Sequence, residues 1–196
     1  MHPPRRARAV PSSADAGGLE PVEAFARSLP RVSWFAAVGA PLDPGEVAEM
    51  AAWASGLVLG RPRVAPVADW SEAGALARAR ADDAGWWARE EDERRTLLAL
   101  AGARHGVEAL LAALSRVTLA ASDAAMAAAS IALGRAGIAD ESLARVAAGA
   151  ASQAAYHAAL GLAAGMTPRH AFAAKFRLHE AGRWPLGIVD GAARLF

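Results

Sequence analysis

Apolar residues recur at three- and four-residue intervals along much of the chain, which is the period of an α-helix with one buried face. The clearest start is Asp-Pro-Gly-Glu at residues 43–46. There Asp43 and Glu46 match a capping box, and Pro44 occupies the first helical position. Apolar residues then continue in this rhythm as far as Val58, before Gly60 and Pro62. A helix is therefore predicted from Pro44 to about Gly60.

Further start and stop signals divide the rest of the chain. Leu19–Leu29 reads as a short helix that Pro30 ends, and a capping box at residues 69–72 opens a helix that runs to about residue 81. Asp82 or Asp83 is expected to cap the helix that begins at Trp86 and Trp87. Thr167 and Pro168 are expected to open a helix that reaches Ala181.

The stretch from Val107 to Gly165 is dominated by alanine, the best helix former. Ser122–Asp123 and Asp140 can each cap a new helix, so this stretch is expected to form separate helices that start near these positions. Small side chains let two helix backbones approach closely, and we expect these to be the central, buried helices. In the last of them one ridge consists of Ala147, Ala151, Ala155, Ala159 and Ala163.

Two segments read as extended chain. Residues 61–68 hold two prolines with Val64 and Val67 between and beside them. Asp190–Gly191 is the dipeptide that a two-residue hairpin turn favours. An isolated hairpin is only marginally stable, so it must lie on the helices or join the extended stretch at residues 63–67.

The predicted fold is mainly α: a single-domain helical bundle of six to eight helices with a short C-terminal β-hairpin. Residues 1–18 are rich in Ala, Pro, Ser and Gly and are expected to form a disordered tail. Residues 19–196 form the domain, in which 168–196 supply the C-terminal helix and hairpin.

Composition narrows the function classes. The net charge of +1 gives no bulk electrostatic argument for nucleic acid, and the lack of cysteine excludes disulfides, thiolate metal sites and a cysteine nucleophile. All basic residues but Lys175 are arginine, a pattern expected of GC-rich coding DNA, so the alanine content carries no function by itself. The uncharged run at 146–166 is long enough to span a bilayer. It is made of Ala and Gly with Gln153 and His157 inside, so no transmembrane segment is expected.

The chain lacks a phosphate-binding glycine loop, a dinucleotide fingerprint, a nucleophile elbow and a His-Glu-x-x-His helix. No glutamate has a histidine three residues after it, which argues against a helical di-iron site. His157 lies one turn after Gln153 on a helix of otherwise small and apolar residues. These two residues are the first candidates for a catalytic pair. His105, His157 and His179 are the alternative metal ligands, and each also reads as an ordinary packed or capping histidine. No cofactor is indicated.

Charged residues suggest two further features. Glu90, Glu91, Asp92 and Glu93 lie among arginines and are expected to form a solvated helix face with i,i+4 pairs, Glu90 with Arg94 and Glu91 with Arg95. The final segment is locally basic and could bind an acidic partner or a phosphate. Its candidate binding residues are Arg169, His170, Arg177, Arg183 and Trp184.

Two functions fit these observations. The first is a non-enzymatic accessory or protein-interaction protein of the bacterial cytoplasm that presents an aromatic and basic surface between Arg169 and Phe196; its partner is expected to be another protein. The second is a small-molecule or metal-dependent enzyme with a histidine-containing pocket between helices. Between them, the first has the better support because catalytic motifs are missing.

Overall fold

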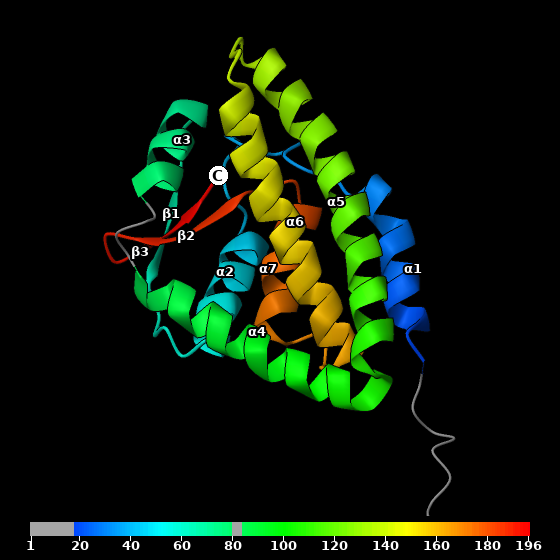
Figure 1. Ribbon diagram of the computed structural model, residues 1–196. Helices are drawn as coiled ribbons and strands as arrows, with labels where there is room; N and C mark the ends of the chain where they lie inside the picture. The colour runs from blue at the N-terminus through cyan, green and yellow to red at the C-terminus, as the bar shows by residue number, and fades with distance from the viewer. Residues whose placement is uncertain (1–17, 80–83) are drawn as a thin grey trace, which may run out of the picture.

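The protein is a bundle of helices with a small sheet on one side, as seen in a computed structural model that describes residues 18–79 and 84–196 (Figure 1). The helices in this part of the chain are α1 Glu20–Ser28, the 3-10 turn η1 Leu29–Arg31, α2 Pro44–Gly56, α3 Trp70–Ala79, α4 Ala84–His105, α5 Val107–Arg135, α6 Glu141–Ala163 and α7 Ala171–Glu180. The strands are β1 Arg63–Pro66, β2 Pro185–Val189 and β3 Ala192–Leu195. The prediction of a mainly α fold with six to eight helices and a C-terminal hairpin is confirmed.

Helices α5 and α6 lie side by side along most of their length and form the centre of the bundle (Figure 1). Helix α1 packs against both of them. The predicted alanine ridge of α6 is buried, with Ala147, Ala151, Ala155 and Ala159 at 0% exposure and Ala163 at 3%. Alanine side chains lose no rotamer entropy on burial and let the two helix backbones pack closely. The buried alanines therefore form the contact surface of α6 in the bundle.

The predicted helix start at Ser122–Asp123 is wrong, because α5 continues from Val107 to Arg135. An N-cap residue must leave the helical backbone conformation to cap a new helix. Alanine on both sides favours helix at every position, and Asp123 is exposed within it. The predicted cap at Asp140 is confirmed, since its side chain accepts a hydrogen bond from the backbone N–H of Leu143 (2.9 Å).

Helix α2 starts as predicted and ends early. Asp43 accepts from the Glu46 N–H and Glu46 accepts from the Asp43 N–H, each at 2.9 Å. The helix stops at Gly56 rather than near Gly60, because the Leu59 N–H bonds back to the Ala54 carbonyl (2.9 Å) in the type of bond that closes a helix C-terminus. Val58 takes the left-handed backbone conformation in this turn (φ 57°) and is 81% exposed, so it does not extend the buried face.

Helix α7 begins at Ala171, later than the Thr167–Pro168 pair predicted. His170 is its N-cap: the ring Nδ1 accepts a hydrogen bond from the Phe172 N–H (3.2 Å). The second predicted capping box is confirmed at Asp69, which accepts from the Glu72 N–H (2.9 Å). Asp82 and Asp83, and the predicted tail up to residue 17, lie outside the described residues.

The C-terminal hairpin joins the extended stretch at residues 63–66, which is one of the two arrangements expected for it. Strand β3 lies in the middle of a three-stranded sheet, antiparallel to β2 across the Asp190–Gly191 turn and parallel to β1. Gly187 (φ 101°) lies in the irregular part of the β2–β3 register, where a Cβ atom would meet the Trp86 indole at 2.4 Å. The hairpin therefore packs directly against α4.

The apolar run at 146–166 falls mainly on α6, whose core-facing side chains are buried in the protein. Among the described residues α5, rather than this run, is the helix long and apolar enough to cross a membrane. One such helix is weak support for a membrane protein, because core helices of soluble proteins pass the same test. This one helix is not enough to indicate a membrane protein, and the expectation of no transmembrane segment remains a prediction.

Candidate functional site

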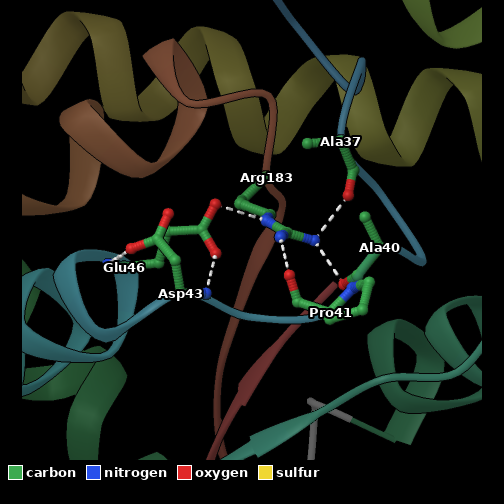
Figure 2. Close-up of polar contacts among 6 residues, drawn as sticks. All are labelled: Ala37, Ala40, Pro41, Asp43, Glu46 and Arg183. Atoms are coloured by element: carbon green, nitrogen blue, oxygen red, sulfur yellow. Dashed lines mark hydrogen bonds and ion pairs between the residues drawn. The ribbon is translucent and has the colours of Figure 1, made fainter.

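Arg183 lies inside the protein and ties the chain between α7 and β2 to the loop before α2 (Figure 2). Its Nε donates to Glu46 Oε1 (2.7 Å), and Nη1 and Nη2 donate to the carbonyls of Ala40 (2.8 Å) and Pro41 (2.6 Å). Nη1 also donates to the Ala37 carbonyl. The side chain is 4% exposed. Arg183 is therefore a structural residue, and the prediction that it belongs to an exposed binding surface is wrong.

Trp184 is buried as well, at 0% exposure. Its indole packs against Phe35 (ring centroids 6.2 Å apart) and Trp70 (5.8 Å), and Trp70 in turn contacts Phe196 (5.2 Å). These rings fill the space between the sheet, α3 and the Phe35 loop. An indole in this position contributes to the core and is not available to a partner.

Three cations of the predicted basic patch form ion pairs with glutamates of the same chain. Lys175 donates to Glu90 Oε1 (2.6 Å), and Arg183 pairs with Glu46 as described. Arg177 forms a two-pronged pair with Glu49, Nε to Oε1 at 2.8 Å and Nη2 to Oε2 at 2.7 Å. Each of these three cations thus has a carboxylate partner on α2 or α4. Of the predicted binding residues, Arg169 alone is exposed; His170 and Arg177 are half-buried.

A pocket of about 240 Å³ opens beside the two remaining candidates, His170 and Arg177, between α1, α6 and α7. Its apolar walls come from Phe25 of α1, from Leu162 and Met166 at the end of α6, and from Phe176 of α7. The rings of Phe25 and Phe176 meet edge to face with centroids 4.8 Å apart. An apolar pocket with a few converging polar groups is the kind of cavity that binds ligands, so this is the candidate site.

Helix periodicity explains which α7 side chains reach the pocket. Residues three, four and seven apart lie on one helix face, and the pocket is lined by Ala173, Phe176, Arg177 and Glu180. Glu180 is exposed as a residue, yet partial burial of its carboxyl group raises the pKa of that group, while Arg177 opposes the shift. The polar groups are thus placed at one side of an apolar wall.

His170 is held in one tautomer by its two hydrogen bonds. Its Nδ1 accepts from the Phe172 N–H, so the ring proton of the neutral form is on Nε2. Nε2 lies 2.9 Å from Glu93 Oε1 and donates to it. The ring therefore caps α7, fastens it to α4 and forms part of the pocket wall with its orientation already set.

Behind the pocket wall lies a buried charged group that the sequence pattern did not predict. Glu90 and Lys175 form an ion pair with side chains 1% and 5% exposed, and the Trp53 Nε1–H donates to the same Glu90 oxygen (2.8 Å). Lys175 Nζ also lies 5.2 and 5.1 Å from the Trp53 and Trp86 ring centroids. Burial alone would raise the pKa of Glu90, but the Lys175 charge, His157 and the two hydrogen bonds hold it below its usual value.

The predicted Glu90–Arg94 pair is therefore wrong. Glu91 pairs instead with Arg94 (2.6 Å) and, as predicted, with Arg95 (3.3 Å). The i,i+4 rule describes neighbours on one helix, but Glu90 points away from that surface toward α7. Asp92 and Arg95 are exposed as expected, whereas Glu91, Glu93 and Arg94 are half-buried and Glu93 bonds to His170.

His157 stands next to this group and is also buried, at 2% exposure. Its ring stacks on Phe172 (centroids 4.3 Å apart, planes at 16°), and Phe172 also meets His170 edge to face at 5.3 Å. Burial, the largest effect, lowers the pKa of His157 to about 4 despite the nearby Glu90 carboxylate. Within the described residues His157 Nδ1 and Glu90 Oε2 have no hydrogen-bond partner, and no hydrogen bond joins His157 to Gln153.

The histidines considered as metal ligands lie in different environments. His105 Nε2 donates to the Ala163 carbonyl (2.9 Å) and ties α4 to the end of α6. His179 lies against Trp34 (5.7 Å) and Phe35 (6.4 Å), away from His157 and its Phe172 partner. In residues 18–79 and 84–196 no group of three or more His, Cys, Asp or Glu side chains is placed to hold a metal ion.

Sequence reasoning found His170 and Arg177 but missed the partners that define the site. The sequence predicts the two helices that carry Phe25 and Phe176, yet nothing in it shows that these helices meet. Glu46, Glu49 and Glu93 are separated from their partners by 77 to 137 positions. Comparison with protein-family models, with curated proteins and with solved structures gives no match.

Proposed function

We propose that this chain is a non-enzymatic protein-interaction module, and that its contact point is the pocket between α1, α6 and α7. The observation that supports this most directly is the pocket itself: four apolar walls with His170, Arg177 and Glu180 at the side. The expected binding surface therefore shifts from Arg183 and Trp184, which are buried, to the face of α7 that lines the pocket.

The size of the pocket favours a partner's side chain over a larger small molecule. Its volume of about 240 Å³ lies below the ~300–1,000 Å³ of pockets that enclose drug-sized ligands. Hot spots of protein interfaces commonly insert one large apolar side chain into such a pocket, with near-neutral contacts around it. Exposed Leu162 (41%) and exposed Arg169 extend the contact area beyond the pocket. The setting we propose is the bacterial cytoplasm.

A library of random peptides displayed on phage tests this proposal. Wild-type protein is the bait, and Ala173→Phe, which fills the pocket from α7, is the counter-bait. Ala77→Phe is the matched control, because Ala77 is a half-buried alanine like Ala173 but lies on α3, away from the pocket. We expect enriched peptides that bind wild type and Ala77→Phe but lose binding to Ala173→Phe.

A second variant keeps the test valid if Ala173→Phe folds poorly. Leu162→Ala trims an exposed wall without touching the core, and we expect it to weaken the same peptides. Enriched peptides that bind all four proteins equally, or a library that enriches nothing, would contradict the proposal.

One observation favours the alternative, an enzyme with a histidine-containing site between helices. Glu90, Lys175 and His157 gather ionisable groups in the interior, where pKa values shift as catalytic groups require. The pocket is lined by none of the three, which is why we rank this alternative second. A metal content of one equivalent in untagged protein, lost in His157→Ala, would favour it.

A further inference from the structure

The ionisable groups that line the pocket, taken together with their direct partners, include more carboxylates than cations. The ionisable residues that line it are His170, Arg177 and Glu180. His170 is bonded to Glu93 and Arg177 to Glu49. The lining groups and their direct partners thus comprise three carboxylates against one arginine and one histidine.

Both lining groups that could attract an anion already have a carboxylate. The Arg177 guanidinium meets Glu49 through two nitrogens and donates a third bond to the Pro168 carbonyl (2.6 Å). The His170 Nε2–H points to Glu93. Arg169, the exposed neighbour of His170, is not among the pocket-lining residues. An acidic ligand group in the pocket would therefore face compensated cations and surplus carboxylates.

Glu180, in contrast, forms no ion pair within the described part of the chain. It lies one turn after Phe176 on the same face of α7, at the edge of the apolar wall. A carboxylate beside aromatic rings suits a cation twice over, through ion pairing and through the negative faces of the rings. The rings in place are Phe176 and Phe25.

We infer that the pocket selects a positively charged anchor: a large apolar group that carries an ammonium or guanidinium, which pairs with Glu180 while the apolar part packs between Phe25, Leu162 and Phe176. In a protein partner this corresponds to an apolar side chain with a Lys or Arg next to it. The inference rests on the proposed function, since it specifies the partner chemistry of the same pocket.

Three small probes of one shape test it: 2-phenylethylamine, 2-phenylethanol and 3-phenylpropionate, which present a cation, a neutral group and an anion on the same phenylethyl body. Each is titrated at pH 7 into uniformly ¹⁵N-labelled protein, and the backbone amide shifts of Gly161, Thr167 and Ala173 report occupancy. We expect the amine to bind up to about fivefold more tightly than the alcohol, the range of an exposed ion pair, and the propionate to bind most weakly.

Glu180→Gln separates charge from shape. It should bring the amine to the affinity of the alcohol and leave the alcohol unchanged. Glu141→Gln is the matched control, since Glu141 is an exposed glutamate at the other end of α6, about 25 Å along the helix from the pocket residues. It should change neither probe.

The outcomes distinguish the charge preference of the pocket from its role as a binding site. Equal affinity of amine and alcohol for wild type, an amine preference that survives Glu180→Gln, or a preference for the propionate would overturn the cation inference while leaving the pocket as a binding site. If no probe shifts these amides, the proposed function itself fails.

Discussion

Glu90 of α4 and Lys175 of α7 form an ion pair in the interior, 2.6 Å apart, although both residues lie in segments that read as solvent-facing charge. The pair connects the helix that supports the pocket from behind to the helix that forms its wall. Removing two charges from water costs free energy, and their mutual attraction offsets part of that cost. The stability of the fold should therefore depend on both side chains.

Removal of one partner should therefore destabilise the protein strongly. Glu90→Gln or Lys175→Met breaks this buried ion pair, and we expect the free energy of unfolding to fall by ~3–5 kcal/mol in each case. The double variant Glu90→Gln with Lys175→Met should lose less than either single variant. Urea unfolding of the four proteins measures this cycle, and single variants that each cost under ~1 kcal/mol would contradict a buried charged pair.

His157 should make the protein sensitive to acid. Its pKa is lowered from 6.5 to about 4 in the folded protein, so between these values the unfolded chain binds a proton that the folded chain does not. The free energy of unfolding must then fall as the pH is lowered through this window. The loss from pH 7.5 to 4.5 is on the order of 2 kcal/mol.

The variant that checks this is His157→Phe, which can keep the stack on Phe172 and has no proton to bind. Its free energy of unfolding should depend less on pH than that of wild type between pH 7.5 and 4.5. The same slope in both proteins would show that the imidazole is not held neutral by burial. Glu90 acts in the same direction nearer pH 4.5, because its folded pKa is lowered too, so some dependence should remain.

Arg183 should tolerate no replacement by lysine. A lysine keeps the charge but cannot reach Glu46 and the carbonyls of the 37–41 loop at once. We expect Arg183→Lys to lower the free energy of unfolding by at least ~2 kcal/mol, and the exposed Arg169→Lys to change it by less than ~0.5 kcal/mol. Equal thermal midpoints for the two variants would show that the clamp in Figure 2 does not stabilise the fold.

Gly182 holds the same connection from the backbone side. It has φ +83°, and a Cβ atom there would lie 2.8 Å from the Ala37 nitrogen. Gly191 in the hairpin turn has a similar φ of +71° with open space around it. Gly191→Ala should cost ~1–2 kcal/mol for the left-handed conformation, and Gly182→Ala at least ~1 kcal/mol more because of the clash. Thermal unfolding that ranks the two in the reverse order would contradict this contact.

Local signals in the chain predicted the local structure well. The caps at Asp43, Asp69 and Asp140 and the turn at Asp190–Gly191 need only a few consecutive residues, and all four are observed. The predicted helix start at Ser122–Asp123 is wrong because a capping residue acts only where a helix begins or ends. The alanines on both sides favour helix, so α5 continues through these two residues.

The site depended on relationships that no local pattern contains. Whether Arg183 faces solvent is decided by Glu46, 137 positions away, and whether Glu90 faces solvent by Lys175, 85 positions away. Charge and composition suggested a basic surface because they count the cations and not their partners. His170 was recognised by its place in the first turn of a helix, a local feature, and it does reach the pocket.

The central claim is that the pocket between α1, α6 and α7 is the contact point for a partner. Its most direct test is the dissociation constant of one library-selected peptide, measured by isothermal titration calorimetry on wild type, Ala173→Phe and Ala77→Phe. If an apolar anchor fills the pocket, Ala173→Phe should weaken binding at least about tenfold, as loss of a hot-spot contact does, and Ala77→Phe should not. A folded Ala173→Phe protein that binds the peptide as tightly as wild type would contradict the claim.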